Sequence, residues 1–154
     1  MEENKEKRYQ KLVKELEVMT DGEENRISVL ANTAALLHNT MDYYFWTGFY
    51  LVEGSELALG PFQGPVACYR IRKGRGVCGA AWQEEKTQVV TDVEQFSGHI
   101  ACSSLSRSEI VVPIYNRNHE VAAVLDVDST ELGSFDAVDQ KYLEQVAAIL
   151  SQFM

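Results

Sequence analysis

The sequence predicts an α+β fold, with one mostly antiparallel β-sheet and the N- and C-terminal helices packed on one of its faces. Three observations favour this fold. Both ends of the chain carry apolar residues at helical spacing, the middle is rich in β-branched and aromatic segments, and short turns join neighbouring segments. The chain has 154 residues and no repeat or linker tract, so a single domain over residues 1–154 is expected.

Each expected element follows from the local pattern. Helices are expected over residues 4–19 and 24–41, separated at Asp21-Gly22. Strands are expected over residues 43–52, 56–59, 66–71, 87–90, 109–115 and 120–127, with a short helix over 77–83. Ser134 is the expected N-cap of a last helix over 135–153. The expected parts of the domain are therefore the N-terminal helices (1–42), the sheet with its loops (43–134) and the C-terminal helix (135–154).

The charge of the chain argues against several classes of partner. Lys and Arg number 14 and Asp and Glu 23, which gives a formal net charge of −9. Such a chain is repelled by the phosphates of nucleic acids and by anionic membrane surfaces, so neither is an expected partner. No apolar run approaches the roughly 18 residues of a membrane span, and no apolar signal segment follows the N-terminus. A cytoplasmic location is therefore expected.

The three cysteines are Cys68, Cys78 and Cys102. In a reducing compartment an odd number of cysteines is not a structural disulfide framework. Cys68 and Cys78 fall in an expected strand and helix, where cysteine is usually a small buried apolar residue. Cys102 differs, because it lies in the polar segment 92–107, whose length is typical of a functional loop.

Two kinds of chemistry fit this cysteine pattern. Near His99 and Arg107, the Cys102 thiol could have a lowered pKa and act as a nucleophile. A zinc site is the alternative, with His99 and the three cysteines as ligands. The nine residues between Cys68 and Cys78 do not match the usual spacing of zinc ligands.

Acidic and aromatic residues on the expected strands form a second candidate site. Asp126 and Asp128 are two positions apart and therefore point to one face of a strand, and Glu109 begins the preceding strand. They are either solvated strand ends or converging acids that hold a cationic ligand. Trp46 and Tyr50 also share a strand face, where they belong either to the core or to the wall of a pocket that accepts a methyl group.

Three segments of the chain resemble a known family. They are GPFQGPVACYRIRKGRGVCGAAW, HIACSSLSRSEIVVPI and AVLDVDS. This combination resembles the free methionine-(R)-sulfoxide reductases, which are small single-domain proteins of the GAF fold. The resemblance extends from Trp46 to the last helix, whereas the N-terminal helices are less diagnostic.

The resemblance assigns a role to each candidate residue. Cys102 matches the catalytic nucleophile, and either Cys68 or Cys78 matches the cysteine that resolves its oxidised form. The acids that match the substrate-binding and polarising residues of the family are Glu109, Asp126 and Asp128. Trp46 and Tyr50 match the methyl pocket. Backbone N–H groups around Ile100 and Ala101 are the expected donors to the substrate carboxylate.

The expected reaction is the reduction of free L-methionine (R)-sulfoxide, a substrate of oxidative-stress repair. Cys102 would pass through a sulfenic acid and a disulfide, preferably with Cys68, and thioredoxin would be the reductant. No metal or organic cofactor is expected, and the resemblance implies a homodimer. The alternatives are a non-catalytic GAF sensor of a small ligand, a zinc-binding module and a purely structural dimer.

Overall fold

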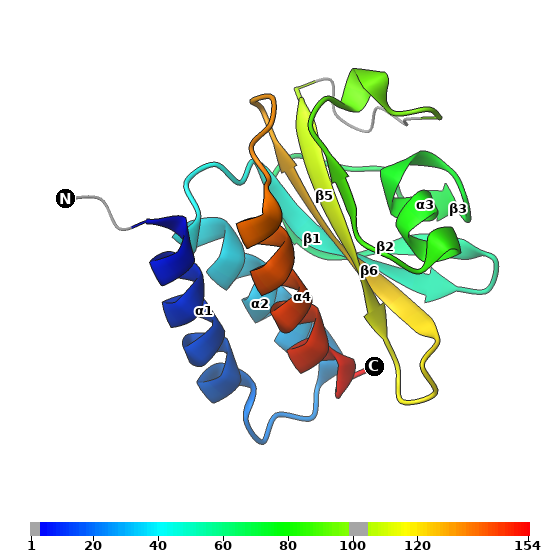
Figure 1. The fold of residues 1–154 in the computed structure, drawn as a ribbon. Coiled ribbons are helices and arrows are strands. Elements are labelled where there is room, and N and C mark those ends of the chain that lie inside the picture. The colour runs from blue at the N-terminus through cyan, green and yellow to red at the C-terminus, as the bar shows by residue number, and fades with distance from the viewer. Residues whose placement is uncertain (1–3, 99–104) are drawn as a thin grey trace.

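The computed structural model describes residues 4–98 and 105–154 of the chain. Its elements are, in order, α1 (Lys5–Thr20), α2 (Arg26–Thr40), β1 (Trp46–Glu53), β2 (Glu56–Gln63), β3 (Arg70–Arg72), α3 (Gly76–Glu84), β4 (Gln88–Val90), the 3₁₀ turn η1 (Val93–Gln95), β5 (Ser108–Tyr115), β6 (Val121–Ser129) and α4 (Ala137–Ser151). Figure 1 shows a sheet with α1, α2 and α4 on one side and α3 on the other. None of the described helices is both long and apolar enough to cross a membrane.

The sheet confirms the predicted α+β class. Its strand order is β3-β2-β1-β6-β5-β4. This order places β1 and β6 in the middle, although they are far apart in the sequence. Every neighbouring pair of these strands is antiparallel. Because side chains alternate along a strand, each central strand contributes to a separate layer on each face.

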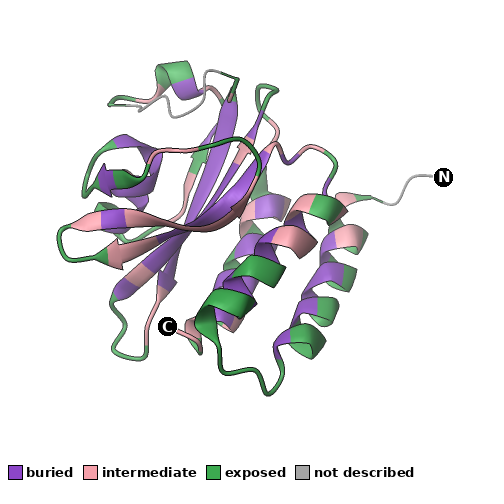
Figure 2. Ribbon diagram, turned by 180° about the vertical axis from the view of Figure 1, so that it is seen from behind, coloured by how far each residue is buried: buried purple, intermediate pink, exposed green. Residues whose placement is uncertain are grey.

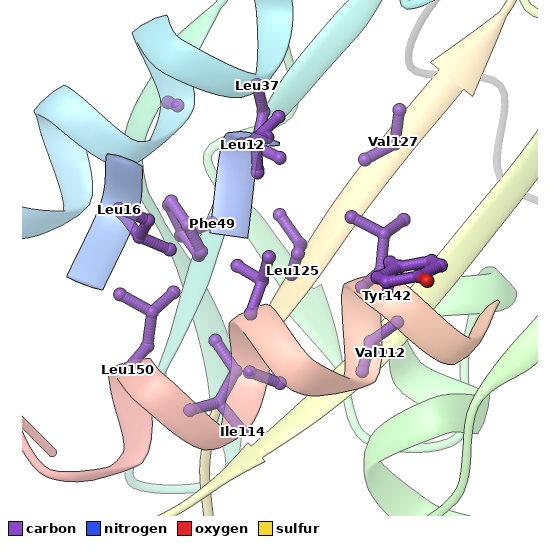
Figure 3. Close-up of a cluster of buried hydrophobic side chains, with 14 of the residues drawn as sticks. Leu12, Leu16, Leu37, Phe49, Val112, Ile114, Leu125, Val127, Tyr142 and Leu150 are labelled. Atoms are coloured by element: carbon purple, nitrogen blue, oxygen red, sulfur yellow. The ribbon is translucent and has the colours of Figure 1, made fainter. Parts of the chain in front are cut away.

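The main hydrophobic core lies between the sheet and the three helices α1, α2 and α4. Figure 2 shows the buried residues of these helices turned toward the sheet. The centre of this core is drawn in Figure 3 and includes Leu12, Leu16, Leu37, Phe49, Val112, Ile114, Leu125, Val127, Tyr142 and Leu150. Burial of these side chains is the main stabilising contribution on this face.

A buried polar cluster ties α1 to α4 at the edge of this core. Asp139 in α4 has no solvent exposure and accepts hydrogen bonds from the hydroxyls of Tyr9, at 2.5 Å, and Tyr43. Lys5 Nζ lies 2.7 Å from the same carboxylate and neutralises it. A buried carboxylate with these partners avoids the cost of an unpaired charge and fixes where the chain enters β1.

The opposite face of the sheet is covered by α3. This smaller core contains Val111, Val124, Ile71, Ala81 and Trp82. Gly79 lets α3 approach the chain before it, because a Cβ at this position would lie 2.5 Å from the carbonyl oxygen of Arg72. The candidate site lies on this face.

Two details of the sequence prediction are wrong. The N-cap of α4 is Asp136, not Ser134, and Asp136 forms a reciprocal capping box with Asp139. The Ser134 hydroxyl instead lies 2.6 Å from that of Ser129.

The predicted strand over residues 66–71 is reduced to Arg70–Arg72, so Cys68 lies in a loop. Side chains of β1 explain this difference. The Trp46 indole N–H donates to the Pro65 carbonyl at 2.9 Å, and the Tyr50 hydroxyl donates to the Cys68 carbonyl at 3.0 Å. These carbonyl groups are therefore satisfied without a neighbouring strand.

Candidate active site

A cavity lies between the α3 face of the sheet and the loop that carries Cys68. Its walls include Trp46 and Tyr50 from β1, Glu109 from β5, Asp126 and Asp128 from β6, and Cys78 from α3. The structure thus brings together every described residue that the sequence proposed for chemistry except Cys68, whose neighbours Val66 and Ala67 line the same cavity.

Strand register places the acids beside one another. Glu109 on β5 is directly opposite Asp128 on β6. Asp126 precedes Asp128 by two residues in β6 and therefore lies on the same face of the sheet. Glu109 shares hydrogen bonds with both aspartates. Only 7% of Glu109 and 5% of Asp126 is exposed, so these acids are not solvated strand ends.

The close acids hold protons more tightly than isolated carboxyl groups. Burial, followed by the charges of Asp126 and Asp128, raises the pKa of Glu109 well above its usual range. Burial and the charge of Asp126 raise the pKa of Asp128 well above its usual range. Burial also raises the pKa of Asp126, although hydrogen bonds from Glu109 and Cys78 oppose this effect. The cluster can therefore keep a proton at a pH where ordinary carboxyl groups have lost theirs.

The aromatic wall faces the acids. Trp46 and Tyr50 stack with ring centroids 6.0 Å apart, and Trp46 stacks on Phe62 at 5.1 Å. Trp46 is directly opposite Asp128 across the β1–β6 ladder. Gly48 makes this packing possible, because a Cβ there would lie 2.3 Å from the Cβ of Phe62 and 2.8 Å from the Trp46 ring.

The cysteines lie in different environments. Cys78 is a buried free thiol, and burial and then the neighbouring charges of Asp126 and Glu109 raise its pKa well above the usual range. Cys68 is half-buried in the loop between β2 and β3 and is disulfide-bonded. The remaining site predictions, Cys102, Ile100 and Ala101, lie outside the described residues, as does His99.

Two polar residues of the cavity wall were missed by the sequence reasoning. Arg75 and Ser106 both line the cavity. Arg75 is the N-cap residue of α3 and lies in the Gly-rich turn KGRG, which matches no known binding motif. Its position between a turn and a helix is the one feature of the sequence that could have indicated a binding role for Arg75. Sequence spacing does not reveal that this turn lies beside the acids.

Neutralising one buried acid should stabilise the fold at high pH. In the unfolded chain these carboxyl groups ionise near pH 4, whereas in the folded chain their pKa values are raised. Between the two pKa values the folded state binds more protons, so its stability falls as pH rises. We expect Asp126→Asn to raise Tm at pH 8 by several degrees, since about 1 kcal/mol corresponds to roughly 2–4 °C in a chain of this size.

This stabilisation should shrink toward pH 4, where the carboxyl groups of the folded wild type are protonated and those of the unfolded chain are about half protonated. Thermal unfolding at pH 4, 6 and 8 measures it. Glu94→Gln, which changes an exposed glutamate in the turn η1, is the matched control and should show no such trend. A stabilisation by Asp126→Asn that did not depend on pH would contradict the proton-linkage explanation.

Comparison with known proteins identifies the family of the chain over nearly its whole length. The GAF domain family matches residues 27–154. The chain is 44% identical to the free methionine-R-sulfoxide reductase of Escherichia coli, over 98% of this chain and 91% of that protein. It belongs to the free methionine-R-sulfoxide reductase family. As a member of this family, the chain is an oxidoreductase.

The reductase is also similar to two further proteins. The crystal structure of free methionine-R-sulfoxide reductase from Neisseria meningitidis in complex with its substrate superimposes with a TM-score of 0.94 at 47% identity, covering 98% of this chain and 90% of that one. GAF domain-containing protein A of Dictyostelium discoideum is 56% identical over 96% of this chain and 92% of its own length. The similarity therefore includes the N-terminal helices as well as the cavity.

Proposed function

We propose that this reductase converts free L-methionine (R)-sulfoxide to methionine, with Cys102 as the nucleophile and thioredoxin as the final reductant. The observation that carries the proposal is a set of three acids, the buried Glu109 and Asp126 and the half-buried Asp128, facing the Trp46–Tyr50 wall in one cavity. The names of the relatives from Escherichia coli and Neisseria meningitidis support the substrate.

The proposal assigns a partner to each part of a free amino acid. Oδ1 of Asp126 is buried and has no hydrogen-bond partner among the described residues, so it can accept a hydrogen bond from the substrate α-ammonium. The terminal methyl group is assigned to the aromatic wall of Trp46 and Tyr50. The carboxylate is assigned to backbone donors near Ile100 and Ala101. A methionine within a peptide lacks the ammonium group and would be a poor substrate.

The acids also assist the chemical step. A sulfoxide sulfur becomes electrophilic when its oxygen is hydrogen-bonded or protonated, and Glu109 or Asp128, with raised pKa values, can supply the proton. The Cys102 thiolate attacks the sulfur and forms a sulfur–sulfur bond, while the protonated oxygen leaves as water and the sulfur–oxygen bond breaks. A water molecule then attacks Sγ of Cys102, the sulfur–sulfur bond breaks, and methionine leaves with the bonding electron pair. Cys102 is left as a sulfenic acid, so the substrate gains the two electrons that the cysteine loses.

Cys68 is the proposed resolving cysteine. Its thiol condenses with the sulfenic acid to form a disulfide and water. Cys68 is disulfide-bonded, whereas Cys78 is a free thiol with a raised pKa, and both observations favour Cys68. The two thiols of thioredoxin then reduce the disulfide by exchange and become oxidised themselves.

A single-turnover experiment tests the proposal. Reduced, full-length protein is mixed with free R or S methionine sulfoxide without added reductant, and methionine and remaining thiols are counted. We expect about one methionine per chain from the R epimer, with the loss of two thiols. Binding of the sulfoxide without release of methionine would instead support a non-catalytic sensor.

Removal of the resolving thiol should separate the two stages of the reaction. We expect Cys68→Ser to release about one methionine per chain in a single turnover and then to stall with thioredoxin, because the sulfenic acid has no efficient partner. A sulfenic-acid reagent should label the stalled protein. Loss of the first turnover in a folded Cys68→Ser protein would contradict the role of Cys68 as resolving cysteine.

A further inference from the structure

Cys78 has no step in the proposed reaction, although it lies inside the cavity. Its sulfur and one carboxylate oxygen each from Glu109 and Asp126 all lie within 4.8 Å of one another. All three side chains are buried, and all three line the cavity. Three potential ligand atoms from α3, β5 and β6 therefore converge on one point that a small ion entering the cavity can reach.

A second observation concerns the hydrogen bonding of Asp126. Asp126 is 5% exposed, and its Oδ1 atom has no hydrogen-bond partner among the described residues. A buried carboxylate oxygen normally has a hydrogen-bond donor or a cation beside it. Arg75 lines the same cavity, but the side chains that hydrogen-bond to Asp126 are Glu109 and Cys78, and neither carries a positive charge.

The chemistry of the three ligands selects the ion. Magnesium and calcium prefer six or more oxygen ligands, whereas zinc accepts a thiolate together with carboxylate oxygens in a four-coordinate site. Three protein ligands leave the fourth position of zinc open to water. We propose that Cys78, Glu109 and Asp126 form a zinc site that inhibits the reductase.

Binding of zinc at this site changes the protonation of its ligands. The ion binds the thiolate form of Cys78, so the thiol proton is released to solvent, and any proton held by the two carboxyl groups is displaced as well. No electrons are transferred. The consequence for function rests on the proposed function: zinc and the substrate ammonium both require the carboxylate of Asp126, so each excludes the other.

Cobalt spectroscopy tests the ligands directly. In full-length protein with Cys68→Ser and Cys102→Ser, Cys78 is the only remaining thiol. We expect Co²⁺ to produce a thiolate-to-cobalt charge-transfer band, Zn²⁺ to remove the band by displacement, and Mg²⁺ to leave it unchanged. The band should be lost when Cys78→Ser is added, and cobalt affinity should fall about tenfold or more with Asp126→Asn. Glu94→Gln is the matched control.

Absence of the band in folded protein, or a band that survives Cys78→Ser, would overturn the proposal. A single cooperative melting transition shows that each variant is folded. The measurement does not depend on turnover, so it stands even if the proposed reaction fails.

Inhibition of the wild-type protein tests the competition. Single turnovers are run on pre-reduced protein without a free dithiol, because dithiols bind zinc. We expect Zn²⁺ to slow methionine release competitively with free methionine sulfoxide, and EDTA to restore the rate, whereas Mg²⁺ has no effect. Inhibition that high substrate concentration cannot relieve would overturn the shared-ligand explanation. If the protein releases no methionine even in EDTA without added zinc, this result rejects the proposed function and leaves the zinc site to the cobalt experiment.

Discussion

Cys102→Ser is expected to reduce turnover of free methionine sulfoxide by roughly 10³-fold or more, because a hydroxyl is a far weaker nucleophile than a thiolate toward sulfur. No other described cysteine can take its place easily. Burial and neighbouring negative charge raise the pKa of the Cys78 thiol, and Cys68 lies in the loop beside the cavity instead of among the acids. The measurement is methionine release in steady state and in a single turnover.

Two controls separate chemistry from binding and folding. Cys102→Ala should be as inactive as Cys102→Ser, and both should retain the wild-type melting temperature within about 2 °C, as expected of substitutions that change stability by less than roughly 0.5 kcal/mol. Both should still bind free methionine sulfoxide, since the acids and the aromatic wall are unchanged. Turnover near the wild-type level in either variant would disprove the nucleophile assignment.

N-acetylation of the substrate is expected to lower kcat/KM by about 10- to 150-fold, since a charge-assisted hydrogen bond contributes roughly 1.5–3 kcal/mol. Acetylation removes the positive charge of the ammonium group. Oδ1 of Asp126, which has no partner in the described structure, then stays unpaired in the complex and adds to the penalty. Initial rates with free and N-acetylated methionine (R)-sulfoxide give the ratio.

A double-mutant cycle shows whether Asp126 is the group that detects the charge. In Asp126→Asn the penalty for N-acetylation should be several-fold smaller than in the wild type, because the charge-assisted contact is already lost. Asp128→Asn should lower kcat as well as raise KM, since an amide cannot deliver a proton to the sulfoxide oxygen. Equal kcat/KM for the two substrates in the wild type would reject this binding mode.

The expected stabilisation by Asp126→Asn and the expected loss of its charge-assisted contact with the substrate have one cause. Three acids packed on one sheet face repel one another, and Glu109 lies directly opposite Asp128. The fold tolerates this repulsion because the main core on the other face, between α1, α2, α4 and the sheet, is apolar and continuous. Local destabilisation at a functional site is a common compromise between stability and function.

The sequence by itself determined the α+β class, the order of the elements and the residue types of the site. Apolar periodicity is strong in α1, α2 and α4, and residues two apart in a strand must share a face, so the pairs Trp46–Tyr50 and Asp126–Asp128 could be recognised without coordinates. The motif around Asp126 and Asp128 also carried the family resemblance. These features are local in the chain, so a sequence can display them.

Only the tertiary structure decided which residues meet. The register between β5 and β6 places Glu109 opposite Asp128, and α3 brings Cys78 to Asp126. The same packing buries these groups and raises their pKa values. The same packing leaves Cys68 in a loop where a strand was expected. The hydroxyl of Tyr50, 18 residues earlier in the chain, donates a hydrogen bond to the Cys68 carbonyl, which in a strand would accept from a neighbouring strand. Burial and long-range pairing depend on the whole fold, whereas propensity and periodicity depend on neighbours in the chain.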